Sequence, residues 1–153
     1  MTVLYFVRHA KAGSRSHWQG DDRRRPLTKK GVKQAEGLID VFKPFKISAV
    51  YSSPYLRCVQ TLEPLARDRE LEIQETSALA EGRGLKRALE LANGSDLDDV
   101  VLSTHGDIVW ELVEELVRRR VIKPGEGGYE KGSTWMVTVE DGEPVRARFI
   151  PAP

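Results

Sequence analysis

The chain has 153 residues, which is enough for one ordinary domain with a buried core of its own. Its 24 basic residues (Lys and Arg) nearly balance its 23 acidic residues (Asp and Glu), so it lacks the uniform positive charge typical of nucleic-acid-binding proteins. A single cysteine excludes an internal disulfide and a cysteine-rich metal cluster. We therefore predict one domain over residues 1–153, in which any anion-binding residues form a local site.

The chain shows no signal for a membrane or an export pathway. No stretch approaches the ~20 apolar residues needed to cross a bilayer. The first residues form a short apolar run without a basic leader, and neither end carries a lipidation motif. We expect a cytoplasmic protein with no membrane partner and no nucleic-acid partner.

The first third of the chain predicts a strand, a long loop and a helix. Residues 3–7 are apolar in succession and rich in β-branched side chains, which is typical of a strand buried on both faces. Residues 11–26 have no apolar period, and a loop of this length next to a central strand favours a functional role. Thr28 is a suitable cap for a helix whose apolar residues recur at three and four positions as far as Phe42.

The middle of the chain repeats this alternation. Residues 47–51 predict a second strand, and Ser52-Ser53-Pro54 predicts a cap and a turn before a helix with apolar residues at 56, 59, 62 and 65. Residues 71–73 predict a weak third strand. A short helix over 85–91 is expected to stop at Asn93-Gly94, and the loop 93–99 leads into a fourth strand at 100–102.

The last third predicts one more helix and a hairpin. The helix begins after Gly106, and a glycine-rich loop follows at 125–132. Residues 135–139 and 145–150 flank Asp141-Gly142, a pattern typical of a β-hairpin. Strands that alternate with helices predict an α/β fold, a three-layer α/β/α sandwich with a mainly parallel central sheet and a C-terminal β-hairpin.

Reactive side chains follow three of the predicted strands. Arg8 and His9 follow the first, Arg57 lies in the helix after the second, and His105 follows the fourth. The carboxyl ends of parallel strands share one edge of the sheet, so we expect these segments to meet there. Guanidinium groups match phosphate oxygens in pairs, and a neutral imidazole is a competent nucleophile toward phosphorus. We predict that His9 attacks the phosphorus, that Arg8, Arg57 and His105 hold the equatorial oxygens, and that water then hydrolyses the phosphohistidine.

These segments match the motifs of a known family. Arg8-His9-Ala10 resembles the R-H-G signature of the histidine phosphatase superfamily, the phosphoglycerate-mutase-like enzymes. Residues 26–35 resemble its P-L-T-x-x-G-x-x-Q-A stretch, residues 52–61 its S-S-P-x-x-R-x-x-x-T stretch, and residues 104–106 its second histidine motif. The resemblance implies a phosphoglycerate mutase-like fold and a phosphatase that needs no metal or other cofactor. Its implied residues are the nucleophile His9, the phosphate ligands Arg8, Arg57 and His105, and the motif residues Thr28 and Gly106 at the substrate.

The resemblance also implies a carboxylic acid that protonates the leaving oxygen. Glu81 is the candidate, because Leu79-Ala80-Glu81-Gly82 is similar to the acid-bearing L-x-E-G segment of the family. A general acid needs a pKa raised by burial or by anionic neighbours. Asp21, Asp22 and Glu130 lie in glycine-bearing loops and remain alternatives.

Departures from the family pattern bear on the substrate. Ala10 replaces the usual glycine, and the E-x-x-x-N pattern of the glycolytic mutases does not follow it, which argues against mutase activity. The chain also lacks the large helical insertion of those enzymes, and this resembles the short SixA-type phosphohistidine phosphatases. We therefore expect an open site that accepts a phosphohistidine protein.

A second resemblance favours a phosphorylated small molecule instead. Residues 8–16 and 20–22, with 131–135, look like the histidine phosphatase domain that follows a Nudix domain in mycobacterial MutT-like enzymes, although the chain has no Nudix metal-binding box. Ser14 and Arg15 are then candidate substrate contacts. Arg15 and the arginines at 23–25 either bind further phosphates or form a solvated charged surface. Trp18 either stacks on a base or packs at the rim.

Other chemistries fit the sequence less well. The three histidines lack metal-ligand spacing, two of them stand near arginines that would repel a dication, and His17 is predicted to be a solvated loop residue. A cysteine phosphatase loop starting at Cys58 would need arginine at position 64, which is Pro64. From another class, a noncatalytic phosphate-binding module remains an alternative. The sequence gives no indication of the oligomeric state.

Overall fold

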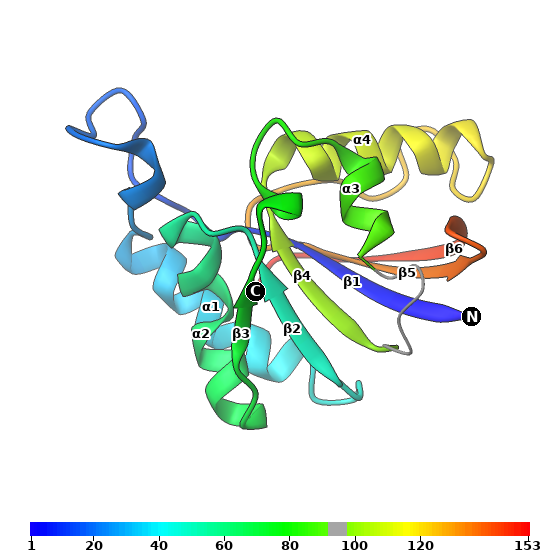
Figure 1. Ribbon diagram of the computed structural model, residues 1–153, viewed down its shortest axis with the longest axis horizontal. Helices are drawn as coiled ribbons and strands as arrows, with labels where there is room; N and C mark the ends of the chain where they lie inside the picture. The colour runs from blue at the N-terminus through cyan, green and yellow to red at the C-terminus, as the bar shows by residue number, and fades with distance from the viewer. Residues whose placement is uncertain (92–97) are drawn as a thin grey trace.

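The computed structural model describes residues 1–91 and 98–153, which form a six-stranded sheet covered by helices on both faces (Figure 1). The strand order is β3-β2-β4-β1-β5-β6. The first four strands in the chain pair in parallel and the last two pair antiparallel. Their bounds are β1 Thr2–Arg8, β2 Ala49–Ser52, β3 Ile73–Glu75, β4 Val100–Thr104, β5 Thr134–Glu140 and β6 Glu143–Ile150. The predicted α/β class, with its mainly parallel sheet and C-terminal hairpin, is confirmed.

Two helices pack on each face of the sheet (Figure 1). Tyr5 and Val7 of β1 belong to a core with residues of α1 and α2, whereas Leu4 and Phe6 belong to a core with residues of α3 and α4. Because side chains alternate along a strand, β1 is buried on both faces, as its apolar run predicted. The helices are α1 Lys29–Val41, α2 Leu56–Arg69, α3 Leu85–Glu90 and α4 Gly106–Arg118, with short 3-10 turns η1 Asp22–Arg24 and η2 Ser77–Leu79.

The second and third strands each begin two residues later than the sequence predicted. The third strand was expected at 71–73, but α2 ends with Glu70 in the left-handed conformation, and the Leu71 amide still donates to the Ala66 carbonyl of that helix. Leu71 is therefore tied to the helix end, and β3 begins at Ile73. The second strand was expected at 47–51, but its pairing with β4 starts at Ala49.

The start of α2 also differs from expectation. The sequence predicted a cap within Ser52-Ser53-Pro54, but Tyr55 occupies the N-cap position and caps without its side chain. The Ser53 hydroxyl is instead engaged with His105. The predicted stop at Asn93-Gly94 lies outside the described residues. Within the described ranges, no helix combines the length and the apolar character that a bilayer crossing requires.

The central strand is held on both sides at its carboxyl end. The Arg8 amide donates to the Ser133 carbonyl over 3.1 Å, and the His9 amide donates to the Thr104 carbonyl over 3.0 Å. The next amide, that of Ala10, donates to the Thr61 hydroxyl over 2.9 Å. Three successive amides are thus fixed by three different segments, and they position the side chain of His9.

Candidate active site

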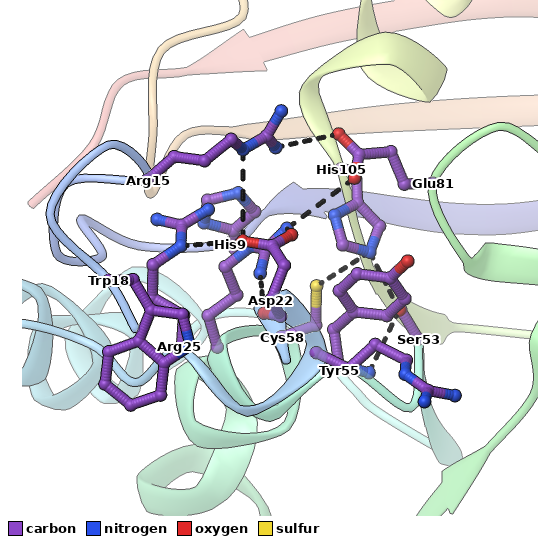
Figure 2. A network of polar contacts seen from close by, with 12 residues as sticks. His9, Arg15, Trp18, Asp22, Arg25, Ser53, Tyr55, Cys58, Glu81 and His105 are labelled. Carbon is purple, nitrogen blue, oxygen red and sulfur yellow. Dashed lines mark hydrogen bonds and ion pairs between the residues drawn. The ribbon is translucent and has the colours of Figure 1, made fainter. Parts of the chain in front are cut away.

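The reactive segments predicted from the sequence meet at the carboxyl edge of the sheet. His9 follows β1 and His105 follows β4, and their rings lie edge-on to one another with centroids 5.7 Å apart (Figure 2). Arg8 ends β1, and Arg57 lies in the first turn of α2. The adjacency of β1 and β4 in the sheet brings together residues that are almost a hundred positions apart.

His9 is buried and neutral. Its side-chain Nδ1 lies 2.8 Å from the Ala10 carbonyl, which can only accept, so Nδ1 carries the proton and Nε2 carries the lone pair. Burial lowers the pKa of His9 to about 3, against the effect of the Ala10 hydrogen bond and with help from the charge of Arg57. At neutral pH the ring is therefore an uncharged imidazole with a free nucleophilic nitrogen.

The segment after His9 is anchored by residues of two family-like motifs. The Thr61 hydroxyl accepts from the Ala10 amide and donates to the Arg57 carbonyl over 2.7 Å, so it ties the segment after His9 to α2. The Gln34 side chain accepts from the Lys11 amide over 2.9 Å. The methyl group of Ala10, at the position where the family usually has glycine, is completely buried in a small apolar cluster with Leu27 and Ala35.

His105 is also buried and neutral. Its Nε2 lies 2.8 Å from the Ser53 hydroxyl and 3.5 Å from the Cys58 thiol. The Tyr55 ring packs edge-on against it at 4.6 Å. Burial, followed by the charge of Arg57, lowers the pKa of His105 to about 4.

The two arginines reach the site from different elements, Arg57 from α2 and Arg8 from β1. Arg57 is fully buried, donates to the Asp22 carbonyl over 2.9 Å and lies 4.9 Å from the centre of the Tyr55 ring. Arg8 donates to the Tyr129 carbonyl over 2.9 Å. Three buried nitrogens lack hydrogen-bond partners within the described part of the chain: Nε of Arg8, Nε of Arg57 and Nδ1 of His105. Buried donors require acceptors, and several cationic ones at one place suit an anion.

Gly106 leaves room for Arg8. A Cβ atom at position 106 would lie 2.6 Å from Nη2 of Arg8 and 2.7 Å from its guanidinium carbon. Any side chain there would displace the guanidinium. Gly106 therefore supports the predicted site through its small size, and a direct contact with substrate remains a prediction.

Two carboxylates form ion pairs with Arg57 in this cluster. Glu81 pairs with Arg15 at 3.0 Å and with Arg57 at 3.8 Å (Figure 2). Asp22 pairs with Arg25 at 2.9 Å and with Arg57 at 3.2 Å. Burial acts to raise the pKa of Asp22, but the hydrogen bond from Arg25 and the charge of Arg57 outweigh it and lower the pKa.

The other candidate acids are engaged elsewhere. The Asp21 carboxylate pairs with Arg23 at 2.7 Å, and this hydrogen-bonded pair lowers the pKa of Asp21 to about 2. The Glu130 carboxylate accepts from the Ala152 amide over 3.2 Å. Of the four carboxylates considered from the sequence, Glu81 and Asp22 are therefore the two that contact Arg57 among the ion pairs of the described residues.

The outer residues predicted to contact the substrate bond to other groups of the protein. Ser14 is exposed, and its hydroxyl lies 2.8 Å from that of Ser16. The Thr28 hydroxyl caps α1 by accepting from the Gly31 amide over 3.1 Å, and it donates to the Lys11 carbonyl over 3.2 Å. Its contacts are therefore structural, and substrate binding by Ser14, Arg15 and Thr28 remains a prediction.

For several residues of the site, no role was predicted from the sequence. Ser53 and Thr61 stand inside the S-S-P-x-x-R-x-x-x-T stretch, so the motif could have drawn attention to them. Tyr129 carries no local signal, since its contact with Arg8 spans 121 positions. Only the fold reveals it.

Comparison with known proteins identifies the family of this chain. Residues 4–86 match the family model of the histidine phosphatase superfamily (branch 1). The chain belongs to this superfamily. Members of the histidine phosphatase superfamily act on phosphoesters, and the predicted family resemblance is confirmed.

The relatives of this superfamily member include a mycobacterial enzyme. This chain is 38% identical over 159 residues to the 8-oxo-(d)GTP phosphatase of Mycolicibacterium smegmatis, and the alignment covers 99% of this chain and 48% of that protein. The chain thus spans about half the length of this relative.

Solved structures share the fold. SixA from Agrobacterium tumefaciens superposes with a TM-score of 0.76 at 22% identity, covering 99% of this chain and 97% of that chain. A protein histidine phosphatase SixA complexed with tungstate gives a TM-score of 0.75 at 22% identity, with 99% and 96% covered. At these identities the likeness establishes the phosphoglycerate mutase-like fold.

Proposed function

We propose that this chain is a phosphatase that hydrolyses phosphomonoesters through a covalent phosphohistidine on His9. The observation that carries the proposal is the state of the His9 ring. It is neutral, its Nδ1 proton is held by the Ala10 carbonyl, and its free Nε2 stands in a site with two arginines. The unpartnered nitrogens of Arg8, Arg57 and His105 supply donors for the phosphoryl oxygens.

In the first step, the lone pair of His9 Nε2 forms a bond to phosphorus while the bond from phosphorus to the ester oxygen breaks. The charge on the three equatorial oxygens is offset by Arg8, Arg57 and the Nδ1 hydrogen of His105. The leaving oxygen takes a proton from a carboxylic acid. The product alcohol departs, and phosphate remains on His9.

Glu81 is the proposed proton donor. Asp22 is held as a carboxylate, because Arg25 and Arg57 lower its pKa. Glu81 contacts Arg57 at a longer distance, 3.8 Å, and its nearer partner is the exposed Arg15. When substrate displaces Arg15, the Glu81 carboxylate takes up a proton from water and then donates it to the leaving oxygen, and Asp22 remains the partner of the buried Arg57.

In the second step, water attacks the phosphorus of phospho-His9. The carboxylate left by the first step accepts a proton from this water, the bond between phosphorus and nitrogen breaks, and phosphate is released with His9 neutral again. No group beyond the side chains named here is required for the proton balance.

A nucleotide or a related phosphorylated small molecule is the proposed substrate class. It is supported by the relative named as an 8-oxo-(d)GTP phosphatase, which aligns over 99% of this chain. A phosphohistidine protein, which the sequence favoured, remains the alternative, because the likeness to SixA concerns the fold. Comparing kcat/KM on a nucleotide panel with kcat/KM on a phosphohistidine protein decides between them.

The test of the mechanism is trapping of the phosphoenzyme by rapid quench with a labelled phosphomonoester. We expect an acid-labile, base-stable label in the wild type and in His17→Ala, whose histidine lies exposed in the loop 11–26. His9→Ala is expected to lose both label and turnover while keeping the wild-type circular dichroism. Turnover by His9→Ala at a rate near wild type would overturn the proposal, and loss of turnover in both variants would contradict a specific role for His9.

A further inference from the structure

Two large aromatic side chains are exposed side by side beside Arg8. Trp110 of α4 is 46% exposed and Tyr129 of the glycine-rich loop is 42% exposed. Their ring centroids are 5.0 Å apart at an interplanar angle of 69°. Exposed apolar surface of this kind on a protein marks a binding surface more often than isolated exposed residues do.

Tyr129 of this aromatic pair contacts Arg8 of the proposed phosphate site. Arg8 donates to the Tyr129 carbonyl over 2.9 Å, and its guanidinium carbon lies 5.8 Å from the centre of the Tyr129 ring. Trp110 lies about one helical turn after Gly106, the residue against which Arg8 packs. A substrate whose phosphate contacts Arg8 therefore has the aromatic pair as a neighbour.

The loop that carries Tyr129 is held in place. The Trp135 indole donates to the Gly128 carbonyl over 2.6 Å. Gly127 has φ +72, and a Cβ atom there would lie 2.6 Å from the Trp135 ring. Trp135 is 1% exposed and belongs to the core, so the loop rests on a rigid base. The pair is thus arranged before any ligand binds, which lowers the entropic cost of binding.

The surface continues into an apolar groove. A groove of about 510 Å³ lies between α4 and the glycine-rich loop, and Trp110, Val113, Val117 and Tyr129 are among the residues that line it. The start of α4 is fixed to the segment of the proposed acid, because Asp107 accepts from the Gly82 amide over 2.8 Å. The groove therefore keeps a constant position relative to Glu81 and Arg8.

We propose that Trp110 and Tyr129 form the subsite that holds the base of a nucleotide substrate by stacking. This inference rests on the proposed function, and it names the residues that make a nucleotide a better substrate than a sugar phosphate. Every planar base can stack on an aromatic side chain, whatever hydrogen-bond donors and acceptors the base carries on its edge. The neighbouring Arg8 then holds the phosphate of the same molecule.

The experiment compares a nucleoside 5′-monophosphate with ribose 5-phosphate, which is the same ester without the base. We expect Trp110→Ala to lower kcat/KM for the nucleotide about tenfold, chiefly through KM, and to leave ribose 5-phosphate within twofold of wild type. Tyr129→Leu keeps the backbone carbonyl that Arg8 uses but removes the ring beside the Arg8 guanidinium, so we expect losses on both esters, with the larger loss on the nucleotide. Trp110→Phe is expected to recover most of the loss.

Trp18→Ala is the matched control. Trp18 is also exposed, at 37%, but it lies in the loop 11–26, where its indole donates to the Asp21 carbonyl. We expect it to lower kcat/KM for both esters by the same factor or not at all. A nucleotide-selective loss in Trp18→Ala with none in Trp110→Ala would overturn the inference, as would equal losses on both esters in Trp110→Ala.

The outcome separates this inference from the proposed function. If the wild type hydrolyses both esters and the Trp110 variants show no selectivity, the phosphatase proposal stands and the base subsite is wrong. If the wild type forms no phosphoenzyme and hydrolyses neither ester, the proposed function fails first. In that case, quenching of tryptophan fluorescence by a nucleoside without phosphate, lost in Trp110→Phe, would still support the subsite, and absence of quenching would overturn it.

Discussion

The Nε2 atom of His105 lies 2.8 Å from the hydroxyl oxygen of Ser53. The Tyr55 amide donates to the same oxygen over 3.3 Å, so the hydroxyl hydrogen is free to point at Nε2. We propose that Ser53 acts as donor to Nε2, so that the His105 proton resides on Nδ1. This tautomer would give a bound phosphoryl group a donor, and Ser53 is the proposed positioning residue for His105.

Ser53→Ala is expected to lower kcat/KM for a phosphomonoester about 10- to 100-fold, the range for leaving a buried polar group, here Nε2 of His105, without its hydrogen-bond partner. Ser53→Thr keeps the hydroxyl and is expected to recover most of the activity. The control is Cys58→Ala, which removes the longer contact to the same Nε2. Burial raises the pKa of the Cys58 thiol to about 12, so this group is neutral, and its loss is expected to change kcat/KM little. Equal losses in Ser53→Ala and Cys58→Ala would contradict the tautomer argument.

Glu81→Gln is expected to slow an alkyl phosphate about 100-fold while slowing p-nitrophenyl phosphate only a few-fold, because nitrophenolate leaves without protonation. Single-turnover rates on the two esters give the ratio directly. Asp22→Asn removes the carboxylate nearer to Arg57 and is the matched control. It is expected to affect both esters alike. If Asp22→Asn shows the dependence on leaving group and Glu81→Gln does not, then Asp22 is the proton donor.

The buried histidines predict loss of stability in acid. Their pKa values in the folded protein are about 3 for His9 and about 4 for His105, below the ordinary value of 6.5. Between pH 6.5 and about 4 the unfolded chain binds more protons than the folded one, so the free energy of unfolding falls as pH falls. Each histidine contributes a slope of at most about 1.4 kcal/mol per pH unit.

Urea unfolding at several pH values between 4 and 7 measures this slope. We expect the wild type to be most stable near pH 7 as far as these two groups are concerned. In His105→Asn the slope is expected to be smaller, because one of the two titrating groups is gone. Curves that run parallel for the variant and the wild type would show that His105 takes no part in the acid destabilisation.

Gly31→Ala is expected to destabilise the fold although alanine normally favours a helix. A Cβ atom at position 31 would lie 2.0 Å from the Lys11 carbonyl oxygen, which belongs to the backbone and cannot turn aside. We expect a loss of about 2 kcal/mol or more in the free energy of unfolding. Gly13→Ala, with no atom within 4 Å of its Cβ, is the control and is expected to change stability by less than about 0.5 kcal/mol. Similar losses in both would contradict the steric explanation.

The sequence predicted the fold class and the meeting of His9 with His105 because both depend on local signals. Buried strands appear as apolar runs, and the residues after them share one sheet edge by topology. Strand ends were predicted less well. Leu71 is apolar enough for a strand, but its amide is bonded to the end of α2, and only the three-dimensional contact decides between the two.

The ionic contacts of the site could not be predicted from the sequence. Asp22 appeared there only as one of several acids in a glycine-bearing loop, whereas the structure shows it between Arg25 and Arg57. The partner of Arg8 is a backbone carbonyl, that of Tyr129, and backbone groups are the same in every residue. Such contacts depend on how distant loops fold over the strand ends, which leaves no pattern in the sequence.

Three successive amides, those of Arg8, His9 and Ala10, fix the backbone at the end of β1. Other residues of the site are not held in this way and can be substituted more freely. The backbone of His9 and Ala10 is joined to β4 and α2, so the backbone of the proposed nucleophile cannot move without breaking these hydrogen bonds. Arg15 and Trp110 belong instead to a surface loop and to an exposed helix face. Substitutions there can alter which molecule is accepted while the reacting nitrogen stays where it is, so one nucleophile can serve different substrates in related chains.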